Sequence, residues 1–287
     1  MPYRIQYVGN LFVDRLYDHF TKLAVQAKCP NLALLGNIGH PTSPRTGEFL
    51  EYCARNWKKV YWVPGPYELG THFFTKAVAT GTFHDNLDRM QTLCERKGIS
   101  MLHQTTLYDN EVRILGATLW TPCHQGRVAD KYSQTEFCTI LKTPQAPITP
   151  IDIADMNVED VHWLKQEILV SRVPTVVLTH HLPHPSLLST AASLQTLKRV
   201  GLEVNMLEYL MAPPVGLWLA GSSGSTATTR FQSGTVAAVN SLYEYPMRTR
   251  HVKNPGFSPA EGISLGEAAS PSSSPFSTTV FYGPRLS

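Results

Sequence analysis

The sequence predicts an α/β fold, and three observations lead to that prediction. Short apolar runs typical of strands alternate with stretches of helical periodicity through the first hundred residues. The run at 31–36 (NLALLG) is apolar at almost every position, as in a central strand covered on both faces. Between residues 99 and 119 the pattern changes to several short strands, which indicates a second sheet.

The first part of the chain has a β-α-β-α-β pattern. Strands are expected at Arg4–Val8, 31–36 and Lys59–Val63. Helices are expected at 13–28 and 47–57. This alternation favours a mainly parallel sheet, whose site lies in the loops that follow its strands. Those loops are 9–11, 36–40 and 64–68.

The second part of the chain is richer in strands. Helices are expected at Phe83–Lys97 and 157–170. Strands are expected at 99–103, 105–108, 112–119, 174–178, 217–220 and 235–240, with a turn at Asp109-Asn110. Residues 121–155, rich in Pro, Thr and Gln, are expected to form a long excursion.

Composition limits the class of protein. The chain has 287 residues, 43% of them hydrophobic and 16% charged, which excludes a disordered chain or a coiled coil. A net charge of +3 argues against a nucleic-acid partner. We expect one domain over 1–254 and a Ser/Pro-rich tail over 255–287, which is flexible or docks back through its apolar residues.

The sequence also suggests where the protein resides. No apolar run approaches the roughly 18–20 residues that span a bilayer, and the N-terminus lacks the apolar region of a signal peptide. The five cysteines show no CxxC spacing, so neither a disulfide framework nor a zinc ribbon is indicated. We expect the cytoplasm or another reducing intracellular compartment.

Six segments occur in an order that resembles a known family. They are RIQYVGNLF, LALLGNIGHP, VYWVPGPYELG, VRILGATLW, VVLTHHLP and LWLAGSSGST, the last ahead of AAVN. Over about residues 3–246 the chain resembles the calcineurin-like metallophosphoesterases. The resemblance implies a four-layer sandwich, in which two facing mixed β-sheets are flanked by helices. It further implies two divalent metals (Mn, Fe, Zn or Mg) in active members, where a metal-bound hydroxide attacks phosphorus.

The chain departs from the family pattern at seven of the eight ligand and catalytic positions that can be carried over. The altered positions are Asn10, Phe12, Asn37, Pro66, Tyr67, Ser222 and Gly224. In this comparison, Asn10 and Asn37 stand where the family has Asp, and Pro66 stands where it has Asn. Phe12, Tyr67, Ser222 and Gly224 stand where the family has His. Neutral amides cannot offset the charge of two cations. Only the fourth motif retains its metal-ligand histidine, His180.

These departures predict a catalytically degenerate protein, a pseudoenzyme that serves as a binding or structural module. A protein partner or larger assembly is expected, and no cofactor. The alternative is an active metal-dependent phosphoesterase with a rearranged or mononuclear site around His180, to which His40 and His184 are nearby candidates. Asp14, Asp18 and His19 are better explained by helix capping and solvation than as replacement ligands.

The expected cleft is rich in hydrogen-bonding groups and poor in charge. Its residues are Asn10, Asn37, Tyr67, Glu68, His180, His181, Ser222 and Ser223. Such a cleft suits a phosphate or nucleotide that is bound without turnover. A metal-free acid/base pair of Glu68 and Tyr67 would require a strongly lowered pKa at Tyr67.

Overall fold

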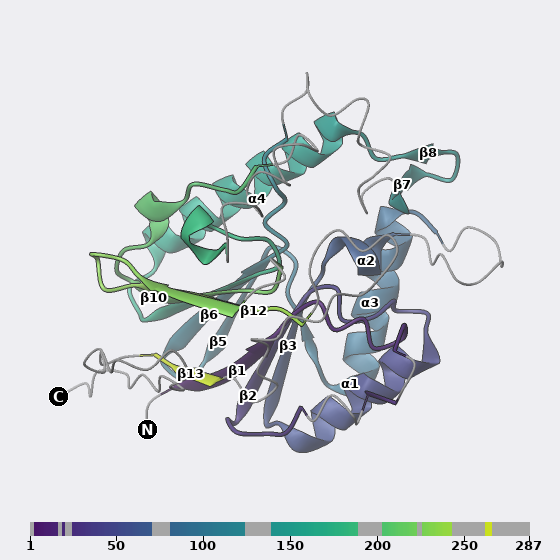
Figure 1. The fold of residues 1–287 in the computed structure, drawn as a ribbon, viewed down its shortest axis with the longest axis horizontal. Helices are drawn as coiled ribbons and strands as arrows, with labels where there is room; N and C mark the ends of the chain where they lie inside the picture. The colour runs from purple at the N-terminus through teal and green to yellow at the C-terminus, as the bar shows by residue number, and fades with distance from the viewer. Residues whose placement is uncertain are drawn as a thin grey trace.

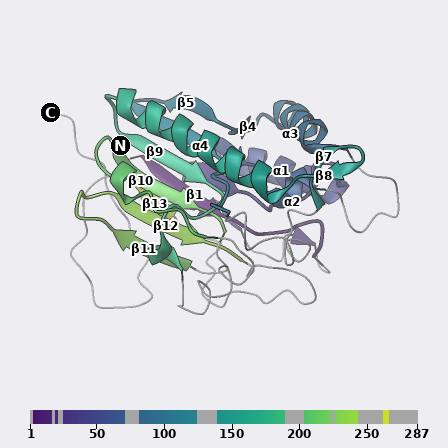
Figure 2. The ribbon, with the colours of Figure 1, turned by 90° about the horizontal axis from the view of Figure 1, so that it is seen from above.

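Two β-sheets face each other at the centre of the molecule, and helices cover both outer faces (Figure 1). The computed structural model describes residues 3–16, 19–20, 25–70, 81–123, 139–188, 203–222, 226–242 and 262–265. Helices α1 and α3 lie against one sheet, whereas α4 runs along the outer face of the other (Figures 1 and 2). The four layers are those that the sequence predicts.

The first sheet has five strands in the order β13-β1-β2-β3-β4. Their bounds are β1 Arg4–Val8, β2 Asn31–Leu35, β3 Lys59–Val63, β4 Ser100–Met101 and β13 Gly262–Ser264. The first four are parallel, and β13 pairs antiparallel with β1. Strand β13 comes from the segment assigned to the tail, and the boundary near residue 254 stays a prediction.

The second sheet has six strands in the order β11-β12-β10-β9-β6-β5. Their bounds are β5 Thr105–Asp109, β6 Val112–Ala117, β9 Thr175–Thr179, β10 Val215–Ala220, β11 Thr226–Arg230 and β12 Val236–Asn240. The four central strands are parallel, and β5 and β11 are antiparallel edges. Asn110, with φ 56°, makes the expected turn between β5 and β6.

The helices begin at the signals that the sequence carries. Their bounds are α1 Pro44–Asn56, α2 Pro66–Leu69, α3 Phe83–Lys97 and α4 Pro150–Val170, with short 3-10 helices at Pro185–Leu187 and Glu208–Leu210. Helix α4 starts earlier than the predicted residue 157, because Thr149 and Asp152 form a capping box and Pro150 occupies the first turn. A small hairpin, β7 Leu141–Thr143 and β8 Ala146–Pro147, precedes it within the predicted excursion.

The helix predicted over 13–28 was wrong for the described part of that segment, which contains no α-helix at 13–16, 19–20 or 25–28. The backbone N–H groups of Phe12 and Val13 donate to carbonyls of the next loop instead. The apolar spacing arises because Phe20 packs edge-on against Phe49 of α1, with ring centroids 5.3 Å apart.

Alternating side chains of the strands divide the core into layers. On β2, Leu32 and Leu34 belong to the cluster beneath α1 and α3, whereas Ala33 and Leu35 lie in the layer between the sheets. A strand buried on both faces therefore reads as continuously apolar. A third cluster, around Leu164 and Ile168, fixes α4 on the second sheet.

Two further observations concern the described residues only. None of their helices combines the length and the apolar character needed to cross a bilayer. Cys29, Cys53, Cys94 and Cys123 are free thiols, and Cys138 lies outside the described residues.

Candidate functional site

The strands of both sheets end at one common edge, where the family motifs meet. Gly9, after β1, forms a parallel bridge with Ser241, after β12, and thereby joins the sheets. The Asn10 N–H donates to the Gly36 carbonyl at 3.0 Å. The Tyr67 N–H donates to Asn37 Oδ1 at 2.9 Å. The first, second and third motifs therefore form one contiguous site.

Glycine allows the two sheets to approach at this edge. A Cβ on Gly221 would lie 1.9 Å from the Leu35 carbonyl oxygen, and one on Gly9 would lie 2.3 Å from the Gly221 oxygen. A Cβ on Gly36 would lie 2.3 Å from His180 Nδ1. The segments around His180 and Gly221 therefore contact the segments around Gly9 and Gly36 closely, at positions where there is no space for a side chain.

The loops at this edge hold an unfavourable backbone conformation. Asn10, Phe12 and Asn37 have φ values of 53°, 47° and 54°. Asparagine tolerates this left-handed region, but a bulky residue such as Phe12 is an outlier there. Such strain persists where surrounding contacts enforce it, and it is concentrated at functional sites. The loops after β1 and β2 therefore have a strained shape that their surroundings enforce.

Glu68 is the carboxylate of the third motif, and it points into the loops. The side chain is fully buried. Its Oε2 accepts from the N–H groups of Asn37 at 2.9 Å and Gly65 at 2.8 Å. Its Oε1 accepts from Ile38 at 2.5 Å and Gly39 at 3.3 Å. Burial raises the pKa of Glu68 to about 7 against the opposing effect of these donors. Glu68 thus binds the second loop to the third.

Two aromatic rings lie at the positions for which the resemblance predicts imidazoles. The rings of Phe12 and Tyr67 pack edge to face with centroids 5.0 Å apart. The Arg15 guanidinium lies 6.0 Å from the first centroid and 5.6 Å from the second. The Tyr67 hydroxyl donates to Asp14 Oδ2 at 3.0 Å, which also accepts from the His40 N–H at 3.2 Å.

Arg15 is a residue of this site that the sequence did not indicate, and Asp14 is one that the sequence assigned to helix capping and solvation. The interpretation of Asp14 as a helix-capping residue was wrong, because no α-helix forms at 13–16 and its carboxylate bonds Tyr67. The sequence feature that could have indicated Asp14 and Arg15 is their position directly after the first motif.

An acid/base pair of Glu68 and Tyr67 would require a lowered pKa at Tyr67, but the structure raises that pKa. Burial, followed by the charge of Asp14, raises the pKa of Tyr67 above its usual value. Tyr67 therefore stays protonated near neutral pH. Because Glu68 is held by four backbone donors, neither group is poised to exchange a proton with a ligand.

His180 lies fully buried beneath this edge. Its Nδ1 is 2.8 Å from the Leu35 carbonyl oxygen, so Nδ1 carries the proton and Nε2 carries a lone pair. Nε2 has no hydrogen-bond partner among the described residues. Burial lowers the pKa of His180 to about 4, so the ring is neutral. The His181 ring packs against it with centroids 4.5 Å apart, and burial lowers its pKa too.

Other predicted residues have hydrogen-bond or ion-pair partners of their own. His40 bonds Thr42 and the Gly70 carbonyl, and His184 caps the turn that begins at Pro185. His19 is exposed, 3.7 Å from Glu48. Pro66 starts α2, and Ser222 is buried. Ser223, Gly224 and Asp18 lie outside the described residues.

The side chains at this edge do not fit the two metals that the fold implies. Such a pair requires carboxylates to offset its charge. The family positions offer the neutral amides of Asn10 and Asn37, while Glu68 and Asp14 are occupied by protein donors. Within the described ranges, no group of three or more His, Cys, Asp or Glu side chains is placed to hold an ion.

Comparisons with known proteins agree with this architecture. No protein-family model matches the chain. The uncharacterized protein L509 of Acanthamoeba polyphaga mimivirus is 23% identical over 258 residues, which cover 83% of this chain and 90% of that protein.

Solved structures to which this chain is similar include a hydrolase and a phosphatase. The phosphopantetheinyl hydrolase PptH from Mycobacterium tuberculosis has a TM-score of 0.57 and 16% identity, over 85% of this chain and 90% of its own. A dimetal phosphatase from Danio rerio has a TM-score of 0.47 and 10% identity, over 83% and 87%. The two facing sheets with their flanking helices, taken with the PptH match, identify the fold of this chain as metallophosphoesterase-like.

Proposed function

We propose that this protein is a catalytically degenerate metallophosphoesterase-like protein, a pseudoenzyme that acts as a binding or structural module. The observation that carries the proposal is that side chains at the predicted metal-binding positions contact one another or the protein backbone and are not available to bind a metal. Phe12 and Tyr67 fill imidazole positions with rings, and the Glu68 carboxylate is used by four backbone N–H groups.

The charge balance supports the same proposal. Two divalent ions bring four positive charges, which neutral amides at Asn10 and Asn37 do not offset. Arg15 adds a further positive charge next to Phe12 and Tyr67. A cation pair at this edge is therefore opposed by a guanidinium and lacks its bridging carboxylate.

The preserved loops are best explained by a binding role. The buried Nδ2 of Asn37 is a donor without a described partner, and the strained backbone at Phe12 is kept by surrounding contacts. A buried donor at Asn37 and the positive charge of Arg15 over the Phe12 and Tyr67 rings suit a phosphate or nucleotide that is bound without turnover. A protein partner or larger assembly would use the same rigid scaffold.

Metal content and turnover test this proposal directly. We would measure bound metals in the purified chain by elemental mass spectrometry, and hydrolysis of an aryl phosphodiester with added manganese. The expected result is substoichiometric metal with no turnover. One or two tightly bound metals together with turnover would overturn the proposal.

Restoring the family residues gives a second test. The substitutions are Asn10→Asp, Phe12→His, Asn37→Asp, Pro66→Asn, Tyr67→His, Ser222→His and Gly224→His. We expect the restored chain to bind manganese, because the glycine contacts that set the loop geometry are retained. The matched control restores six positions and keeps Asn37, so that the bridging carboxylate is missing and binding is weaker. A restored chain that binds no manganese would argue against the assignment of these positions.

A second candidate function is favoured by one specific observation at His180. An imidazole whose Nδ1 is held by a carbonyl and whose Nε2 lone pair is unused is the arrangement of a metal-ligating histidine. An active phosphoesterase with a single ion here would give stoichiometric heat on titration with zinc or manganese, and His180→Gln would abolish that heat. Titrations without heat would end this candidate.

A further inference from the structure

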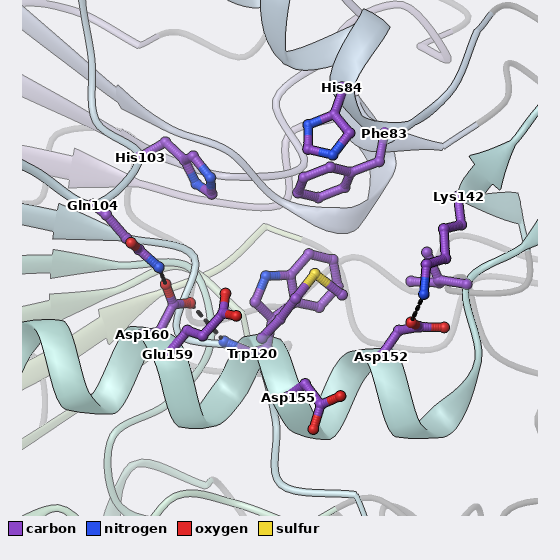
Figure 3. A pocket seen from close by; sticks show the side chains of 12 residues that line it. Phe83, His84, His103, Gln104, Trp120, Lys142, Asp152, Asp155, Glu159 and Asp160 are labelled. Carbon is purple, nitrogen blue, oxygen red and sulfur yellow. Dashed lines mark hydrogen bonds and ion pairs between the residues drawn. The ribbon is translucent and has the colours of Figure 1, made fainter.

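A pocket of about 440 Å³ lies on another part of the molecule, between α3, the β7–β8 hairpin and the first half of α4 (Figure 3). Its lining includes Phe83 and His84 from the start of α3, and His103 and Gln104 from the turn before β5. Trp120 forms the floor, and Lys142 comes from the hairpin. The pocket uses no residue of the strand-end site, so it stands independently of the proposed function.

The wall formed by α4 carries most of the charge in this pocket. Asp152, Asp155, Glu159 and Asp160 all line it, and Lys142 is the single lysine or arginine of the lining. Lys142 forms an ion pair with Asp152. Asp155 and Glu159 are exposed and have no hydrogen-bond or ion-pair partner among the described residues. The negative charge of Asp155 nevertheless contributes to raising the pKa of Lys142, so Asp155 shares this lysine with Asp152. Glu159 therefore lines the pocket without a counterion among the described residues.

The remaining groups are arranged around these carboxylates. Asp160 is buried and is fixed by Gln104 Nε2 at 3.0 Å and the Trp120 N–H at 3.2 Å. Phe83 and Trp120 have ring centroids 6.3 Å apart and provide an apolar floor together with Met156. His103 has a buried Nδ1 without a described partner, and burial lowers the pKa of this ring, which keeps it neutral.

The geometry favours an elongated cation over a single metal ion. No three His, Cys, Asp or Glu side chains of the described residues converge closely enough to hold a metal. The carboxylates at 152, 155 and 159 follow one helix face, with axial separations of about 4.5 and 6 Å from a rise of about 1.5 Å per residue. Carboxylates spaced in this way match ammonium groups joined by short aliphatic chains.

We propose that this pocket binds a small linear polyamine, whose ammonium groups pair with Asp155 and Glu159 while its methylene chain lies on Trp120 and Phe83. Aromatic faces attract cations and cover aliphatic chains. Lys142 competes with the polyamine for the carboxylates of α4, because its ammonium group already forms an ion pair with Asp152.

Calorimetric titration of the full chain with spermidine tests the proposal. We expect saturable one-to-one binding. The double variant Asp155→Asn/Glu159→Gln should bind about tenfold more weakly, because it loses two exposed charge pairs with the ligand. Both side chains are exposed, so the variant should fold normally, which a thermal melt verifies.

Two further variants separate binding from general charge effects. Lys142→Met removes the internal competitor and should tighten spermidine binding about threefold, an effect that loss of structure would not produce. Glu111→Gln removes an exposed carboxylate outside the pocket and should leave the affinity unchanged.

Several outcomes would overturn the proposal. They are the absence of saturable heat, equal affinity in the double variant and the parent, and equal binding of an uncharged diol of similar chain length. Displacement of spermidine by low magnesium concentrations at constant ionic strength would point to a metal site instead.

Discussion

Substituting Gly221 by alanine tests the close approach of the two sheets that assembles the strand-end site. The added Cβ would lie 1.9 Å from the Leu35 carbonyl oxygen and 2.6 Å from the Leu35 Cβ. Ordinary contact begins near 3.4 Å, so one of the two strand ends must move by about 1.5 Å. Backbone atoms cannot rotate out of the way, and Gly9 closes the other side.

The size of the effect follows from what that movement separates. Gly221 follows β10 of the second sheet, and Leu35 ends β2 of the first, so the shift opens the layer between the sheets. Overpacking a tight interior costs about 1–3 kcal/mol, and a clash with backbone belongs at the upper end. We therefore expect Gly221→Ala to lower the free energy of unfolding by about 3 kcal/mol or more.

Gly47→Ala provides the matched control. Gly47 lies within α1, and a Cβ there meets nothing within 4 Å. Alanine is the better helix former, so this variant should gain up to about 1 kcal/mol. Urea denaturation followed by circular dichroism measures both variants on the full chain. A free energy for Gly221→Ala within about 0.5 kcal/mol of the parent would refute the packing argument.

Two other predictions concern buried ionisable groups. Glu68→Ala should lower the free energy of unfolding by several kcal/mol in urea denaturation, because four N–H donors lose their acceptor at about 1–3 kcal/mol each. Glu111→Ala is the exposed control, and equal stability of the two variants would contradict the assignment. For His180, whose pKa of about 4 lies below the usual 6.5, stability is lost as pH falls from 6.5 towards 4, by about 3 kcal/mol. NMR titration should give its midpoint near 4, and a midpoint near 6.5 would show that the ring is not buried as described.

Much of the fold could be predicted because strand and helix signals are local. The apolar run of β2, the capped helix α3 and the Asp109-Asn110 turn were all predicted from neighbouring residues. The helix expected at 13–28 was wrong for its described residues 13–16, 19–20 and 25–28, where Phe20 packs on α1 without forming part of an α-helix. The periodicity of apolar residues indicates which side chains are buried, but it does not determine which backbone hydrogen bonds form.

The residues of the candidate site were named from the sequence, and this assignment stays a prediction, whereas their arrangement could not be predicted. The motif positions Asn10, Asn37 and His180 were found from the order of six segments. The use of Glu68 by four backbone donors and the bond from Tyr67 to Asp14 could not be predicted, because they join loops far apart in the chain.

The sequence by itself determined the alternation of strands and helices, the order of the six segments and the residue types at the positions predicted to bind metal, since these are properties of residue type and local pattern. Only the tertiary structure decided how these side chains are arranged: Phe12 and Tyr67 are in mutual contact, Glu68 binds two loops together, and His180 Nε2 has no partner among the described residues. The physical reason is that the pKa of a side chain and its hydrogen bonds depend on the groups that surround it in space, and the two sheets bring those groups together from distant parts of the chain.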